Sequence, residues 1–411
     1  MRRTTTRRRA ALALSLLAGC VLPSCIGAPT AQDLATLLPA APEVALGPNL
    51  GRTLGADDVV ADSVVFPADP VLGEYPRIPV LVRTGADSLL AVASVRRGSI
   101  ADSAPSALRA AVSNDGGRTW DRFPLAENRT TADGDAAAVM DPSTGLVHVL
   151  GREQYTSADG GRTWTARPTV VLPNAAGITG DPGGPGAGIA LRTGPHAGRL
   201  VVMCRATTTA PLPELLEVLA GRPSGTNCTL TSDDHGATWR TSTTVQPGVG
   251  EGAVVELADG RLYMSSRTYG YDGHRSQAYS ADGGSTWVDL GRSVLPEPSF
   301  GVNGSLTRAT TTGGRDVVVY ANVPEWGAPF GIVPVVRKDL SLYVSYDGTR
   351  SWRFARVLRR GPGAYTSMTA LGGDIGVLYE TVVEGVNDTT VTTEHPEGIR
   401  FTRVRTDALL D

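Results

Sequence analysis

Three segments of the chain place arginine, glutamate or tyrosine where they could act on an anionic substrate. Arg77 stands in the run 75–79, Tyr-Pro-Arg-Ile-Pro, just before a short apolar strand. Glu251 follows a glycine in a turn that precedes another strand, and Tyr365 lies in a Gly- and Pro-rich segment. Arginine offers planar, permanently charged donors for a carboxylate, and tyrosine becomes a nucleophile when a neighbouring base takes its proton. These residue types predict a site for an acidic substrate if the fold brings them together.

A single arginine is weak evidence in this chain. Lysine and arginine total 38, and Lys338 is the only lysine, so the other 37 are arginines. Only several such residues in a defined order along the chain would be evidence for a functional site. The net charge of −3 gives no reason to expect a nucleic-acid partner.

The elements that must position these residues are marked by an eight-residue pattern, Ser-x-Asp-x-x-x-Ser/Thr-Trp. The Asp-Gly and Gly-Gly steps in most copies suit the positive φ angles of a tight hairpin turn, and the aspartate can accept hydrogen bonds from turn amides. Tryptophan then begins the next strand with a large apolar surface to bury between sheets. Five of the six tryptophans occupy this position, and the copies span residues 113–120, 157–164, 232–239, 280–287 and, more weakly, 345–352.

Repeated hairpins at intervals of about 45 residues or more predict an all-β fold of the β-propeller type. The 49 glycines and 28 prolines suit a protein of short strands and many turns. Two of the gaps between copies are long enough for a loop insertion or a degenerate blade. Five visible copies and one closing blade predict a six-bladed β-propeller over residues 70–411.

The repeat resembles the Asp-box, or BNR repeat, of bacterial exo-α-sialidases, and the resemblance covers essentially residues 70–405. Propellers with such repeats also serve as binding modules, so the boxes indicate the fold more than the function. The functional residues of that family match this chain in the same order along the sequence, interleaved with the boxes.

The resemblance implies a triad of carboxylate-binding arginines, Arg77, Arg267 and Arg337, and a nucleophile, Tyr365, within Ala-Tyr-Thr-Ser. It also implies that Glu251, which stands five residues before a Glu-Leu pair, is the base that activates the tyrosine.

Three further residues follow from the same resemblance. Arg97 stands five residues before Asp102, a spacing that matches an arginine for substrate hydroxyls and the acid/base aspartate. The pattern departs here, because Arg96 adjoins Arg97 and the Asp102 loop is rich in Ser, Ala and Pro. Glu380 matches the glutamate that supports the first triad arginine.

The implied function is that of a retaining exo-α-sialidase, which removes terminal sialic acid through a sialyl-tyrosine intermediate. The resemblance implies no metal and no organic cofactor, sialylated glycans as substrates, and a monomer. A trans-sialidase would share all these residues. A catalytically inactive sialic-acid-binding propeller would not need the Glu251/Tyr365 pair.

The first residues predict export. Five arginines precede an apolar run, Ala10 to Leu17, and residues 1–19 are interpreted as a lipoprotein-type signal peptide because Leu17-Ala18-Gly19-Cys20 resembles a lipobox. We expect lipidation at Cys20, an Ala/Pro-rich tether over residues 20–69 and an extracellular, cell-surface lipoprotein; otherwise the protein would be secreted. Outside the cytoplasm, Cys204 and Cys228 could form a disulfide or remain two buried thiols.

Overall fold

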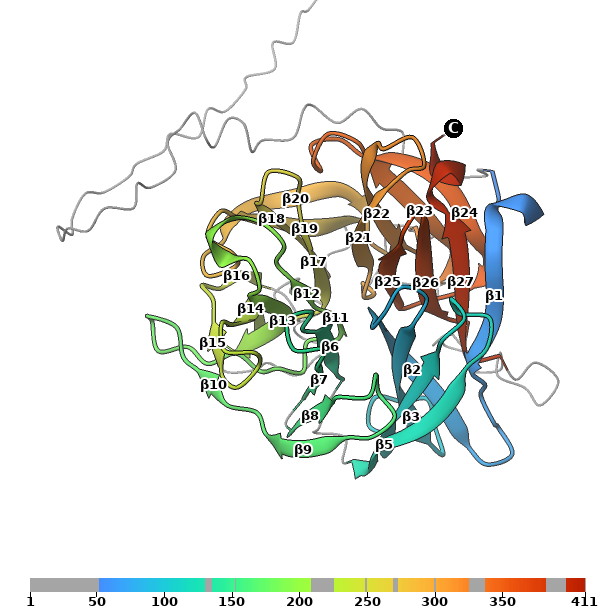
Figure 1. The fold of residues 1–411 in the computed structure, drawn as a ribbon, viewed down its shortest axis with the longest axis horizontal. Helices are drawn as coiled ribbons and strands as arrows, with labels where there is room; N and C mark the ends of the chain where they lie inside the picture. Colours follow the sequence, from blue (N-terminus) through green and yellow to red (C-terminus); the bar gives the residue numbers. More distant parts are fainter. Residues whose placement is uncertain are drawn as a thin grey trace, which may run out of the picture. The chain divides into compact units, whose positions relative to one another are not determined.

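Six sheets surround a central axis in the computed structural model (Figure 1). The structure describes residues 52–129, 135–151, 153–207, 225–247, 250–268, 273–298, 301–324, 337–381 and 397–410. The predicted signal peptide, Cys20 and residues 20–51 of the predicted tether lie outside these residues. The fold is all-β with six blades, which confirms the predicted six-bladed β-propeller.

Five of the blades follow one another along the chain. The first contains β2 (Glu74–Arg83), β3 (Leu89–Arg97), β4 (Ser106–Ser113) and β5 (Asp121–Arg129). The second contains β6 (Ala137–Met140), β7 (Val147–Leu150), β8 (Glu153–Ser157), β9 (Thr165–Pro168) and the short β11 (Gly186–Ala187). The third contains β12 (Ile189–Ala190), β13 (Leu200–Thr207), β14 (Gly225–Ser232), β15 (Trp239–Thr241), β10 (Val171–Leu172) and β16 (Val245–Pro247). The fourth contains β17 (Gly252–Glu256), β18 (Leu262–Ser266), β19 (His274–Ser280) and β20 (Val288–Pro296). The fifth contains β21 (Ser305–Thr310), β22 (Asp316–Asn322), β23 (Lys338–Ser345) and β24 (Arg353–Pro362).

The sixth blade joins the two ends of the described chain. It contains β25 (Thr366–Leu371), β26 (Asp374–Glu380), β27 (Ile399–Arg405) and β1 (Val59–Phe66), and β1 pairs antiparallel with β27. The predicted tether boundary at residue 69 is therefore wrong, because residues 59–66 are the outer strand of this blade. Short 3-10 turns, η1 (Ala56–Asp58), η3 (Gly194–His196) and η4 (Thr406–Leu409), complete the described elements, and none of these is a helix that could cross a membrane.

All five repeats lie at one structural position, the hairpin between the third and fourth strands of a blade, where residues 113–120, for example, join β4 to β5. The sixth blade carries no repeat because its corresponding strands, β27 and β1, come from opposite ends of the chain. This geometry explains why five copies mark six blades.

The aspartate of each repeat fastens its own turn. The carboxylate of Asp115 accepts hydrogen bonds from the Ser113 hydroxyl, the Thr119 hydroxyl and two turn amides. Partial desolvation opposes ionisation, but these hydrogen bonds outweigh it and lower the pKa of Asp115 to about 2. Gly117 has a φ of 91° and lies so close to Phe401 of the neighbouring blade that a Cβ would clash. The repeats are therefore structural, and their aspartates are engaged in the turns.

The tryptophans of the repeats pack between blades, as the sequence predicts. The Trp120 ring lies edge-on to Phe401, with ring centroids 5.4 Å apart. Trp239 is completely buried and donates a hydrogen bond to Gln154 of the preceding blade. In the same blade as Trp239, Cys204 and Cys228 face each other across β13 and β14 and form a disulfide, which resolves the alternative that the sequence leaves open.

His148 on β7 makes the stability of the fold dependent on pH. Its side chain is buried, and its ring accepts a hydrogen bond at Nδ1 from Gln154. Desolvation, assisted by the nearby Arg167, lowers the pKa of His148 to about 4, against about 6.5 in an unfolded chain. Between pH 6.5 and pH 4 the unfolded state therefore binds a proton that the folded state does not, and His148 reduces stability by about 3 kcal/mol across this range.

The test is urea unfolding of the protein and of His148→Gln at pH values from 7.5 to 4.5. Because other buried groups also titrate, the informative quantity is the difference between the two stability curves. We expect the variant to gain stability relative to wild type as the pH falls below 6.5. Parallel curves would show that His148 makes no such contribution.

Candidate active site

Tyr365, Glu251 and Arg267 meet at one end of the propeller axis. Nη1 of Arg267 donates to the Tyr365 hydroxyl at 2.8 Å and to Oε1 of Glu251 at 2.6 Å. Tyr365 stands just before β25 and Glu251 just before β17, the innermost strands of the sixth and fourth blades. Oε2 of Glu251 is buried without a hydrogen-bond partner among the described residues. The predicted nucleophile and base thus share one guanidinium nitrogen, and the base keeps one oxygen available.

Burial controls the state of the phenol. Tyr365 is 6% exposed, and desolvation raises its pKa well above the ordinary value, whereas the charges of Arg267 and Arg337 oppose that shift. The tyrosine is therefore protonated in the free protein. It needs a base to become a nucleophile, and Glu251 is the adjacent carboxylate.

Glu380 holds the side chain of Arg77 in place through an ion pair. Nε of Arg77 lies 3.0 Å from Oε1 of Glu380, and both side chains are almost fully buried. The same carboxylate oxygen accepts the Ile78 amide at 2.6 Å, which fixes a residue with an unusual φ of 56°. The Glu380 amide in turn donates to the carbonyl of Tyr365. Glu380 therefore connects the first predicted triad arginine to the backbone of the predicted nucleophile.

Arg337, the third predicted triad arginine, lies near the ring of Tyr365. Its guanidinium carbon is 5.9 Å from the centre of the tyrosine ring, and Nη2 donates to the carbonyl of Gly301 at 2.8 Å. Gly301 has a φ of 66°, and a Cβ there would lie 2.6 Å from Cγ of Arg267. Glycine at this position therefore allows Arg267 and Arg337 to approach from neighbouring blades.

The structure corrects the choice between the two adjacent arginines on β3. Arg97 forms an ion pair with Glu127 of β5. Arg96 is 5% exposed and pairs with Asp102 at 2.6 Å. Successive side chains of a strand point to opposite faces, so only one of the two can face the site, and that residue is Arg96. Asp102 lies in the loop between β3 and β4, with 82% of its side chain exposed.

Asp135 belongs to the site although no sequence motif marks it. Desolvation and the nearby Glu251 raise its pKa to about 7, Arg96 and Arg77 lower it, and Asp102 adds to the rise. These neighbours place the carboxyl group among the predicted site residues. The available signal was its position just before β6, the first strand of the second blade along the chain, which is equivalent to the positions of Glu251 and Tyr365 in their blades.

A buried ion pair holds a backbone segment that contacts the site. Arg275 and Glu297 are both fully buried, with Nη1 2.7 Å from Oε2. Arg275 also donates to the carbonyl of Val302, and Glu297 accepts the Val302 amide. Val302 adjoins Gly301, whose carbonyl binds Arg337. Burial raises the pKa of Glu297 to about 7 even though Arg275 favours its charged form, so the pair holds the 301–302 segment at an electrostatic cost.

The assembled side chains suit a substrate that carries a carboxylate next to its reacting carbon. Three guanidinium groups from the first, fourth and fifth blades supply positive charge, and Glu380 is already committed to one of them. A protonated tyrosine, a carboxylate beside it and two further carboxyl groups, Asp102 and Asp135, could exchange protons with such a substrate. The structure thus brings together every predicted catalytic and substrate-binding residue except Arg97.

A comparison of this chain with known protein families agrees with the repeats found in its sequence. Residues 141–379 match the BNR repeat-like domain family, which is more than half of the chain. The chain belongs to the BNR repeat-like domain family. The repeat at residues 113–120 lies on the N-terminal side of that match.

Individual relatives support this family assignment. The sialidase of Micromonospora viridifaciens is 31% identical over 347 residues, which are 74% of this chain and 49% of that protein. The chain therefore spans about half the length of this relative. Among solved structures, a Hadza microbial sialidase has a TM-score of 0.62 at 22% identity, covering 82% of this chain and 66% of its own. The intramolecular trans-sialidase from Ruminococcus gnavus has a TM-score of 0.62 at 16% identity, covering 86% and 99%. The two structures show the shared fold.

Proposed function

We propose that the protein is a retaining exo-α-sialidase that hydrolyses terminal sialic acid through a sialyl-tyrosine intermediate. The observation that carries the proposal is the junction of Tyr365 and Glu251 on Arg267, with Arg77 and Arg337 close by. The sialidase relatives support the substrate class. Sialic acid has a carboxylate on its anomeric carbon, which would repel an acidic nucleophile and favours a tyrosine.

In this mechanism the three arginines hold the substrate carboxylate. Glu251 takes the proton of Tyr365, whose oxygen bonds to the anomeric carbon while the glycosidic bond breaks and Asp102 protonates the departing oxygen. Water, deprotonated by Asp102, then attacks the anomeric carbon, and the tyrosine leaves and recovers its proton. Two inversions retain the configuration.

Proton NMR of the reaction with an aryl α-sialoside tests this proposal. The first product should be the α-anomer of free sialic acid, before it mutarotates. Initial formation of the β-anomer would reject the covalent intermediate, and no release of sialic acid would reject the activity. Addition of lactose distinguishes a trans-sialidase, which would form sialyl-lactose.

The acid role of Asp102 predicts that its loss depends on the leaving group. An aryl leaving group departs without a proton, whereas the alkoxide of lactose requires one. We expect Asp102→Asn to reduce kcat/KM for sialyl-lactose by roughly 10²–10⁴-fold and to reduce that for an activated aryl sialoside far less. The measurement is kcat/KM on both substrates.

Two further variants make this test decisive. Asp57→Asn removes an exposed carboxylate on η1, outside the site, and should leave both substrates unaffected. Asp135→Asn tests the other carboxyl group, whose raised pKa of about 7 also suits an acid. If Asp135→Asn shows the leaving-group dependence and Asp102→Asn does not, the acid role belongs to Asp135.

A further inference from the structure

The opposite end of the propeller axis holds a cavity of about 360 Å³, the far cavity. The innermost strands start at the candidate active site and run away from it, so their far ends surround this cavity. Thr369 lines it and stands four residues after Tyr365 on β25, roughly 13 Å along an extended strand. Glu256 lines it at the far end of β17, whereas Glu251 precedes the start of that strand.

A much smaller pocket lies between the two ends. The space there is only about 10 Å³, lined among others by Gly252, Asn303 and Thr366, which lie near the starts of the innermost strands. This is roughly the space for one water molecule. The far cavity is the compartment with room for a sugar, and the candidate active site lies at the other end of these strands.

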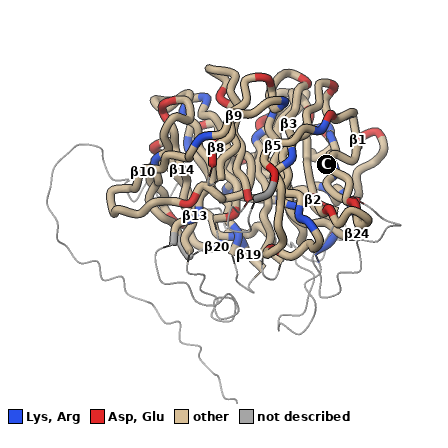
Figure 2. Tube along the Cα trace, turned by 90° about the horizontal axis from the view of Figure 1, so that it is seen from below, with Lys and Arg blue, Asp and Glu red and all other residues tan. Residues whose placement is uncertain are grey.

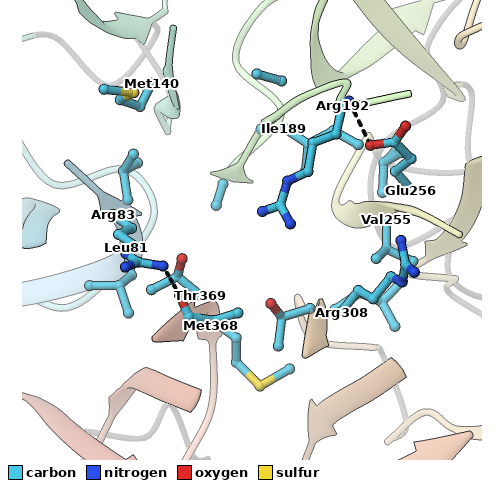
Figure 3. A pocket seen from close by; sticks show the side chains of 18 of the residues that line it. Leu81, Arg83, Met140, Ile189, Arg192, Val255, Glu256, Arg308, Met368 and Thr369 are labelled. Carbon is cyan, nitrogen blue, oxygen red and sulfur yellow. Dashed lines mark hydrogen bonds between the residues drawn. The ribbon is translucent and has the colours of Figure 1, made fainter. Parts of the chain in front are cut away.

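Arginines from three blades line this compartment. Figure 3 shows the Arg192 side chain projecting into the cavity, with Arg83 across from it and Arg308 on a third side. The guanidinium group of Arg192 has no hydrogen bond or ion pair with any residue that the structure describes. Arg308 pairs through Nε with Asp316, and its terminal nitrogens have no acceptor among those same residues. Arg83 donates to the carbonyls of Gly85, Ala86 and Ala370.

The acidic residue of this lining, Glu256, already accepts hydrogen bonds from backbone amides. Both oxygens of Glu256 accept backbone amides, from Arg192 at 2.8 Å and from Thr193 at 2.9 Å, and Oε1 also accepts the Thr193 hydroxyl. Glu256 therefore anchors the backbone that presents Arg192 instead of neutralising its guanidinium group. Three positively charged side chains line the cavity, and its one negatively charged side chain, Glu256, is hydrogen-bonded to the backbone. Such a lining attracts anions.

We propose that this far cavity binds a small organic carboxylate of monosaccharide size, with Arg192 and Arg308 as its principal donors. Arginine donors favour an oxyanion. The walls below them are apolar, formed by Leu81, Ile189, Val255 and Met368 among others, and the volume lies in the range of ligand pockets, about 300–1,000 Å³. A bare inorganic ion would leave most of these walls uncovered, whereas the ring of an acidic sugar would cover them.

Isothermal titration calorimetry of the full chain with D-glucuronate, D-glucose and sulfate at constant ionic strength tests the proposal. Arg337→Ala is the background, because it weakens carboxylate binding at the candidate active site. We expect this protein to bind glucuronate and to bind glucose and sulfate at least tenfold more weakly. Adding Arg192→Ala and Arg308→Ala should weaken glucuronate binding by tenfold or more.

The matched control is the pair Arg118→Ala and Arg240→Ala in the same background, which removes two exposed arginines elsewhere. This pair should leave glucuronate binding unchanged, which separates a site from a general charge effect. Melting temperatures of all variants show that the fold is intact, independently of the proposed sialidase activity. Glucuronate binding that survives the loss of Arg192 and Arg308 would overturn the proposal, as would equal binding of glucose or sulfate.

Discussion

Replacing Tyr365 with phenylalanine is expected to reduce turnover of an aryl sialoside on the order of 10³-fold, as the loss of a nucleophile does in enzymes with covalent intermediates. The substitution removes only the hydroxyl that Arg267 binds at 2.8 Å. The ring is buried in the core shared by the fifth and sixth blades, so the fold should survive. The measurement is kcat from initial rates of fluorophore release, with circular dichroism to confirm the fold.

The matched control is Tyr379→Phe. Tyr379 is as buried as Tyr365 and lies on the next strand, β26, but its hydroxyl contacts Thr402 instead of a site residue. This variant should keep turnover within a few fold of wild type. If Tyr365→Phe also kept near wild-type turnover, the assignment of the nucleophile would be wrong.

Glu297→Ala is expected to have the largest effect on stability, about 3–5 kcal/mol, because it leaves the charge of Arg275 buried without its partner. Both side chains are fully buried in the structure. The loss should also loosen the 301–302 segment, whose Gly301 carbonyl binds Arg337. We therefore expect a higher KM for the sialoside with a smaller change in kcat, in addition to the lower free energy of unfolding.

Two comparisons separate these effects. Asp259→Ala breaks a pair with Arg261 in which the carboxylate is half exposed, and it should cost less than about 1 kcal/mol. The double variant Glu297→Leu, Arg275→Met removes both buried charges and should recover most of the lost stability. If it restored stability and also KM, the pair would have no role in positioning Arg337.

The sequence by itself determined the fold class, because the repeated turn depends on local contacts. In each repeat the aspartate binds groups within four residues, as Asp115 binds Ser113 and Thr119. Such contacts can be read from residue spacing alone. The number of blades followed from the copies, and the types and order of Arg77, Glu251 and Tyr365 pointed to the site.

Only the tertiary structure decided which neighbour of a predicted residue faces the site. Arg96 and Arg97 are chemically identical, and the alternation of β3 selects Arg96. The strand at residues 59–66 is recognisable only through its pairing with β27, more than 300 residues away. Asp135 and the Arg275–Glu297 pair acquire their roles from burial and from charges on other blades. Long-range pairing and desolvation leave little trace in local sequence, so these features required the assembled propeller.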